Sequence, residues 1–155
     1  DGLTMEHVSL DAVLKDAVLN LEEHEIYPDL IVSLEETFPF RENTLIDDII
    51  DHTLDDGFDT VIAAKRESSS LWQEDDKEGF KRLDSGDTPR LYKEKSYIGM
   101  EGLCCVTRPE FLRQENLFIG KVGLYEINTP LSFFEVRDRD GRETASKLMS
   151  YYNYG

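Results

Sequence analysis

The sequence predicts an α/β domain, in which helices cover a mostly parallel sheet. Two amphipathic helical patterns, over about 8–24 and 45–54, each precede a short apolar run typical of a buried strand, at 30–34 and 58–64. Helix, strand, helix and strand with short connections form the pattern of an α/β crossover. The chain has 155 residues, of which 39% are hydrophobic, and this suffices for one domain with a core. We therefore expect a single α/β domain.

The first helix and strand are separated by a clear change of periodicity. Apolar residues recur at helical spacing from Val8 to Leu21, with charged residues on the other face, and Ser9 is the expected N-cap. Pro28 ends the helical tendency. The apolar run at 30–34 then predicts a strand of a parallel sheet, buried on both faces.

A second helix and strand repeat this pattern. Apolar residues from Leu45 to Leu54 form a stripe with a period of 3.6 residues, and aspartates lie opposite. Gly57 is the expected C′ residue of this helix, because glycine tolerates the left-handed conformation found there. The run at 58–64 predicts the next buried strand.

The second half of the chain predicts shorter elements. Turn residues between 65 and 89 indicate loops or a small hairpin, and 96–106 indicates one or two strands. Thr107 and Glu110 have the spacing of a capping box and predict a helix start. The remaining expected elements are strands over 121–127 and 133–136 and a closing helix over 142–151.

Composition restricts the partners of the protein. There are 17 Lys and Arg residues against 33 Asp and Glu, which gives a formal charge of −16. This charge argues against nucleic acid or anionic membranes as partners. An anionic ligand would need cations placed nearby or a divalent metal.

The two cysteines indicate a reducing compartment. Cys104 and Cys105 are adjacent in an apolar run, so they are expected to be small buried side chains without a disulfide. The apolar stretches are far shorter than the ~20 residues of a membrane span, and no signal-peptide pattern is present. We therefore expect a soluble, cytoplasmic protein.

Four segments follow one another in an order that suggests a family. The first, 34–41, reads Leu-Glu-Glu-Thr-Phe-Pro-Phe-Arg between a predicted strand and a predicted helix. The second, 57–62, reads Gly-Phe-Asp-Thr-Val-Ile and is followed further on by Trp72. The third, 90–97, is rich in basic residues, and the fourth, 135–138, reads Glu-Val-Arg-Asp. Loops at the carboxyl ends of parallel strands are where such sheets bind ligands.

Together these segments resemble the cytidylyltransferases of the sialic-acid-activating type, the acylneuraminate cytidylyltransferases (CMP-N-acetylneuraminic acid synthetase-like). The resemblance implies a three-layer, Rossmann-like fold of the nucleotide-diphospho-sugar-transferase kind, truncated at its N-terminus because the family's CTP-binding loop is missing. The family's first motif is usually Leu-Gln-Pro-Thr-Ser-Pro-Leu-Arg. This chain keeps Thr37, Pro39 and Arg41 but has Glu35 and Glu36 at the Gln and the first Pro.

The resemblance implies transfer of CMP from CTP to a 2-keto-3-deoxy sugar acid, with release of pyrophosphate, in a homodimer that uses Mg²⁺. A dimerisation excursion would span about 79–109. No residue is assigned a catalytic role. By resemblance, the substrate contacts are Glu35, Arg41, Arg90 and Lys93, and the metal ligands are Glu135 and Asp138.

Two departures from the family keep other interpretations open. The 155 residues contain no Gly-rich phosphate loop, and Arg137 stands where the family has its second metal-binding aspartate. The chain alone is therefore not expected to be a competent enzyme. The alternatives are a non-catalytic α/β module for binding or dimerisation, and an unrelated doubly wound binding domain.

Overall fold

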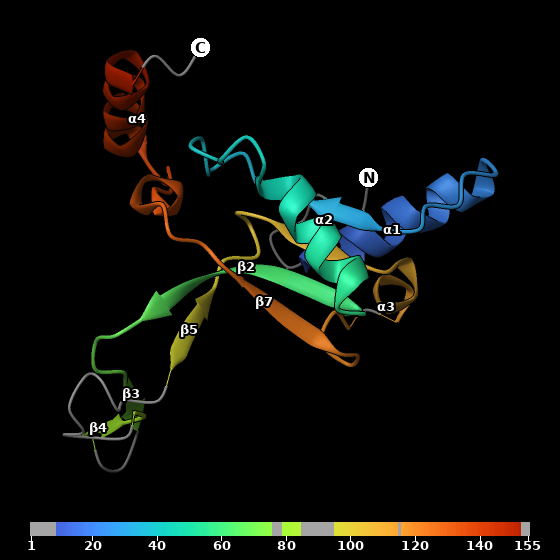
Figure 1. The fold of residues 1–155 in the computed structure, drawn as a ribbon, viewed down its shortest axis with the longest axis horizontal. Helices are drawn as coiled ribbons and strands as arrows, with labels where there is room; N and C mark the ends of the chain where they lie inside the picture. Colours follow the sequence, from blue (N-terminus) through green and yellow to red (C-terminus); the bar gives the residue numbers. More distant parts are fainter. Residues whose placement is uncertain (1–8, 76–78, 85–94, 115, 153–155) are drawn as a thin grey trace.

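A mixed five-stranded sheet lies at the centre of the protein, and a two-stranded hairpin projects from it (Figure 1). The structure is a computed structural model, and it describes residues 9–75, 79–84, 95–114 and 116–152. The sheet consists of β1 (Ile31–Ser33), β2 (Thr60–Glu67), β5 (Ser96–Gly99), β6 (Cys105–Thr107) and β7 (Val122–Glu126), and the hairpin of β3 (Trp72–Asp75) and β4 (Gly79–Arg82). The helices are α1 (Leu10–Glu23), α2 (Leu45–Asp55), α3 (Pro109–Arg113) and α4 (Arg139–Tyr152), with a 3₁₀ helix, η1 (Pro130–Phe133), before α4.

Strand β2 organises the sheet. It pairs in parallel with β7 along one edge, and antiparallel with β6 and β5 along the other. Strand β6 also pairs antiparallel with β1, so β1, β2 and β7 all point in one direction. The sheet is thus mixed: the strands expected to be parallel share a direction, and antiparallel β6 lies between β1 and β2.

Helices cover both faces of this sheet. Helix α2 contributes Ile49 to a core cluster that contains Val61 of β2 and packs against Val32 of β1. Helix α1 contributes Val18 to a second cluster, against which Ile31 packs. Neighbouring residues of a strand point to opposite faces, so the two clusters lie on opposite sides of β1. The domain is a mixed α/β fold, as the sequence predicts.

Both expected helix ends in the first half are confirmed. The Ser9 hydroxyl accepts a hydrogen bond from the Ala12 amide at 3.3 Å and caps α1. Gly57 follows Asp56, the C-cap of α2, and has φ +62°. Only glycine adopts this left-handed backbone conformation without a steric cost, which explains why the helix ends there.

Most expected strands are also confirmed. The run at 30–34 contains β1 and the run at 121–127 contains β7, while β2 begins within the run at 58–64 and continues to Glu67. The region 96–106 contains β5 and all of β6 except its last residue. The small hairpin expected between 65 and 89 is β3 and β4. The residues of β1 are only half-buried, because β1 is an edge strand of the sheet that the structure describes.

The capping box expected at Thr107 is wrong. Thr107 is the last residue of β6, and its hydroxyl hydrogen-bonds across the sheet to the Thr60 hydroxyl, with the two oxygens 2.7 Å apart. The N-cap of α3 is Arg108, without a side-chain cap, and Pro109 takes the first helical position, which suits its fixed φ. The Thr107 hydroxyl therefore bonds within the buried β2–β6 pair and does not cap α3 as the local pattern predicts.

The strand expected over 133–136 is also wrong. Pro130 starts η1, in which the Ser132 amide donates to the Thr129 carbonyl at 3.1 Å, and Phe134 follows as its C-cap. Residues 134–136 form no strand. The apolar run reflects packing at the end of a 3₁₀ turn rather than a sheet position.

The closing helix α4 and the β3–β4 hairpin both extend away from the sheet, and they lie apart from each other in Figure 1. The two cysteines are buried and not bonded to each other, as expected. Within the ranges that the structure describes, no helix combines the length and the apolar character that crossing a membrane requires.

Candidate functional site

Two segments from opposite halves of the chain meet beyond the carboxyl end of β1. The 34–41 loop follows β1 directly, and the 134–138 segment connects η1 to α4. The Val136 amide donates a hydrogen bond to the Thr37 carbonyl at 2.8 Å and joins them. The first and fourth family-like segments of the sequence are therefore neighbours in space.

Arg41 fastens the 34–41 loop to the turn between β5 and β6. Its Nε donates to the Leu103 carbonyl at 2.8 Å, its Nη1 to the Phe38 carbonyl at 2.8 Å, and its Nη2 to the Gly102 carbonyl at 3.0 Å and to the Glu35 carbonyl. A guanidinium has five N–H donors, and four are directed at backbone oxygens here. Burial lowers the pKa of Arg41, while the nearby Cys104 and Glu35 groups act in the opposite direction. An anionic ligand could reach Arg41 only by competing with these carbonyls.

Glu35 lies directly against the turn that Arg41 holds. Its amide donates to the Gly102 carbonyl at 2.7 Å, and its carboxylate accepts from the Thr37 hydroxyl at 3.4 Å. A Cβ at Gly102 would lie 2.6 Å from Cδ of Glu35. Gly102 therefore provides the space for the Glu35 side chain, and any side chain at this position would force it to move.

A hollow of about 230 Å³, the carboxylate hollow, lies between α1 and the end of β1. Leu10 and Leu14 of α1 form an apolar wall of this hollow. Its polar groups come from Ser33, Glu35 and Glu101. The two carboxylates at this hollow favour a ligand that presents hydroxyl or cationic groups there, and they disfavour a ligand that presents a carboxylate. The sequence patterns do not single out Glu101, because it belongs to a turn whose place beside Glu35 depends on tertiary contacts.

The two expected metal ligands are engaged in contacts within the protein. An oxygen of Glu135 lies 2.8 Å from Nη2 of Arg137. Asp138 accepts a hydrogen bond from the Gly141 amide at 2.6 Å and so caps the start of α4. The hydrogen bond to Glu135 raises the pKa of Arg137, and the charges of Glu135 and Glu35 act in the same direction.

A second hollow, the arginine hollow, lies at the start of α4 and has a volume of about 300 Å³. Three arginines line it, although the chain as a whole is strongly acidic. One of them, Arg139, also pairs with Glu143 one helical turn later, with Nε and Oε1 3.3 Å apart. The residues lining the hollow are Val136, Arg137, Asp138, Arg139 and Arg142.

Asp59, in the second family-like segment, has a structural role. Its carboxylate accepts from the Lys121 amide at 2.7 Å, and its own amide donates to the Lys121 carbonyl at 2.9 Å. These bonds join the starts of β2 and β7. Because β1 and β2 point in the same direction, Asp59 lies at the opposite end of the sheet from the 34–41 loop.

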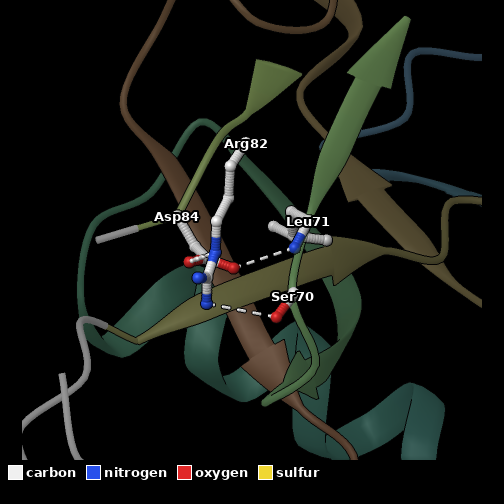
Figure 2. Close-up of polar contacts among 4 residues, drawn as sticks. All are labelled: Ser70, Leu71, Arg82 and Asp84. Carbon is white, nitrogen blue, oxygen red and sulfur yellow. Dashed lines mark hydrogen bonds and ion pairs between the residues drawn. The ribbon is translucent and has the colours of Figure 1, made fainter. Parts of the chain in front are cut away.

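The β3–β4 hairpin has an ordered polar base and an exposed apolar surface. Figure 2 shows Arg82 between Asp84 and Ser70: its Nε lies 2.7 Å from Asp84 Oδ1, and its Nη2 donates to the Ser70 hydroxyl at 3.2 Å. Asp84, whose side chain is only 2% exposed, also accepts from the Leu71 amide at 2.9 Å. Beyond this base, Trp72 and Phe80 are 58% and 69% exposed.

The structure places the candidate residues in three groups. It brings Glu35, Arg41 and the 134–138 segment together, and it places Asp59 and the hairpin elsewhere. Arg90 and Lys93, the expected basic contacts, lie outside the described residues. Within the described residues there is no group of three or more His, Cys, Asp or Glu side chains arranged to hold a metal ion.

No family model matches the chain, and no curated protein is significantly similar to it in sequence.

Proposed function

We propose that the chain forms the sugar-acid side of a cytidylyltransferase, which transfers CMP from CTP to a 2-keto-3-deoxy sugar acid of the sialic-acid type and releases pyrophosphate. Its sheet would then be the central layer of a three-layer, Rossmann-like fold. The observation that supports this is the hydrogen bond from the Val136 amide to the Thr37 carbonyl. It joins two segments that resemble family motifs, at a sheet end of the kind where α/β folds bind ligands.

The residues of this site would bind and orient the sugar acid. The carboxylates of Glu35 and Glu101 line one hollow and can accept hydrogen bonds from sugar hydroxyls. Arg41 holds the loop that positions Glu35, through its bonds to the Gly102 and Leu103 carbonyls. Transfer of a nucleotidyl group depends mainly on such positioning and on charge neutralisation, so the absence of an assigned catalytic residue is compatible with the reaction.

The Mg²⁺ ion implied by the resemblance would neutralise charge on the phosphates of CTP. The residues proposed to hold it do not fit this role. Glu135 is paired with Arg137, and one oxygen of Asp138 is taken by the Gly141 amide. Arg90 and Lys93, which are basic, remain candidates for contacts to the sugar carboxylate.

The proposal is tested by pyrophosphate release from CTP by the full-length protein, measured with a panel of 2-keto-3-deoxy sugar acids and with Mg²⁺ present or absent. We expect release that requires both substrates, and a KM for the sugar acid that rises about tenfold in Glu35→Gln, which corresponds to loss of one hydrogen bond to a charged group. The matched control is Glu36→Gln in the same loop, which should leave KM unchanged. Absence of release with every acid in the panel would contradict the proposal.

A second candidate, a non-catalytic dimerisation module, is favoured by the exposed side chains of the hairpin. All residues of β3 are exposed, and Trp72, Phe80 and Leu83 present apolar surface. A two-stranded hairpin alone is marginally stable in water, so a second copy of the chain packed on it would stabilise it. Sedimentation of the native protein and of Phe80→Glu tests this: a dimer lost in the variant, without binding of CTP or sugar acid by the native protein, would favour the second candidate over the first.

A further inference from the structure

Three charged side chains gather around the hydrogen bond between Val136 and Thr37. Arg137 and Glu135 form an ion pair at 2.8 Å on either side of Val136, and the Glu35 carboxylate accepts a hydrogen bond from the Thr37 hydroxyl at 3.4 Å. The two carboxylates come from the 34–41 loop and the 134–138 segment, which the backbone hydrogen bond holds together. The cluster therefore contains two negative charges and one positive charge.

Carboxylates that a fold brings together repel each other unless a cation lies with them. A protein can supply that cation as a bound divalent metal or as a guanidinium. The guanidinium of Arg137 stays protonated at every physiological pH, and its contact with Glu135 is a charge-assisted hydrogen bond. One of the two negative charges of this cluster is thus already offset by a residue of the chain.

The surroundings also disfavour a bound metal cation. Asp138 borders the arginine hollow, where Arg137, Arg139 and Arg142 would repel a divalent ion. One oxygen of Asp138 already accepts the Gly141 amide, which removes part of its capacity as a ligand. A metal at Glu135 would have to displace Arg137, and a metal at Asp138 would lie among three guanidiniums.

We propose that Arg137 is a built-in counter-ion, which takes the place of a divalent cation where the 134–138 segment meets the 34–41 loop. The cluster of Glu35, Glu135 and Arg137 therefore does not take up Mg²⁺ or Mn²⁺ in the native protein. This inference does not rest on the proposed transferase function, because its readout is cation binding rather than turnover. Failure of the transferase assay leaves it standing, and its own failure leaves the transferase proposal standing.

The test is a titration with Mn²⁺, in which paramagnetic broadening of the NMR amide signals of residues 35–37 and 135–138 reports binding. The native protein should show no broadening specific to these residues. Arg137→Asp should gain it, with a Kd for Mn²⁺ at least about tenfold lower than in the native protein, because two units of charge change beside the ion. The double variant Glu135→Gln/Arg137→Asp should lose most of that gain.

Arg139→Asp is the matched control, because it makes the same charge change on the neighbouring exposed arginine. It should not reproduce the gain at 35–37. Should Arg137→Asp fail to fold, Arg137→Gln removes the counter-ion with a smaller perturbation and should show a weaker gain at the same residues. Broadening at Glu135 in the native protein, or equal affinities in the native, Arg137→Asp and Arg137→Gln proteins, would overturn the inference.

Discussion

Arg41 connects the backbone of two loops rather than presenting a free cation. Its guanidinium satisfies carbonyl groups at 35, 38, 102 and 103, none of which belongs to the ladder of the sheet. The sequence could identify an important arginine in a loop at the end of a strand. It could not identify the partners, because the carbonyls at 102 and 103 are about sixty residues away and carry no sequence signal.

Loss of Arg41 should destabilise the domain. Arg41→Ala leaves the Phe38 and Leu103 carbonyls without this part-buried donor and the Gly102 carbonyl with only the Glu35 amide, so we expect a decrease of about 2–4 kcal/mol in the free energy of unfolding. Urea denaturation followed by circular dichroism measures this, with Arg139→Ala as the exposed control. If Arg41→Ala unfolds at the same urea concentration as that control, Arg41 is not the structural fastener described above.

The two buried thiols make stability depend on alkaline pH. Burial raises the pKa of Cys104 to about 11 and that of Cys105 to about 12, from an ordinary value of 9.0. A pKa that is raised in the folded state stabilises the protein fully below pH 9 and progressively less as the pH rises through the folded-state values. Stability should therefore decrease from about pH 9 upward.

This dependence is measured by urea denaturation at a series of pH values, for the native protein and for Cys104→Ala/Cys105→Ala. The pKa values of Tyr97 and Tyr125 are also raised, the first mainly by its hydrogen bond to Glu126 and the second mainly by burial. They contribute in the same direction in both proteins. The cysteine contribution is thus the difference between the two curves, and parallel curves above pH 9 would show that the thiols are not buried in solution.

The β3–β4 hairpin depends on the polar contacts at its base. Asp84 is buried and accepts from the Leu71 amide and from Arg82, so Asp84→Ala removes an acceptor from both. We expect amide exchange within 70–75 and 79–84 to accelerate by about tenfold or more while the protection of the central sheet is unchanged, because elements with few buried contacts open locally. Glu74→Ala, an exposed change within β3, is the control.

The elements that sequence predicts well are those defined by local periodicity. Helix α2 shows this, since its stripe of apolar residues and its Gly57 end are local signals. Prediction from the sequence fails where a side chain bonds to a residue far away in the chain instead of to its neighbours. Thr107 bonds to Thr60 instead of capping α3, and Arg41 takes carbonyls of the turn that divides β5 from β6.

For the whole molecule, charge opposes self-association. A formal charge of −16 on each copy makes two chains repel, and salt screens that repulsion. If the hairpin with its exposed Trp72 and Phe80 is the dimer contact, the dimer should become more stable as salt is added. Sedimentation at low and high ionic strength measures this, and dissociation at high salt would indicate an interface of opposite charges instead.

The α/β class and the order of the elements up to β7 follow from the sequence, whereas the mixed direction of the strands does not. Strand β6 has three residues and reverses direction between β1 and β2, an arrangement that depends on pairing between distant segments. The candidate site, too, is predicted only in part from the sequence. The sequence identifies the 34–41 and 135–138 segments, but their contact and the Glu135–Arg137 pair emerge only from the fold.

Binding of the sugar acid at this site can be measured by titrating the protein with a 2-keto-3-deoxy sugar acid and monitoring the amide chemical shifts. We expect shifts that saturate at Ser33 to Glu35 and at Glu101 and Gly102, because these residues line the carboxylate hollow. We also expect them at Val136 and Arg137, because the Val136 amide bonds to the same loop at Thr37. Saturable shifts confined to the β3–β4 hairpin, or none at any concentration of the acid, would contradict the claim that this junction binds the sugar acid.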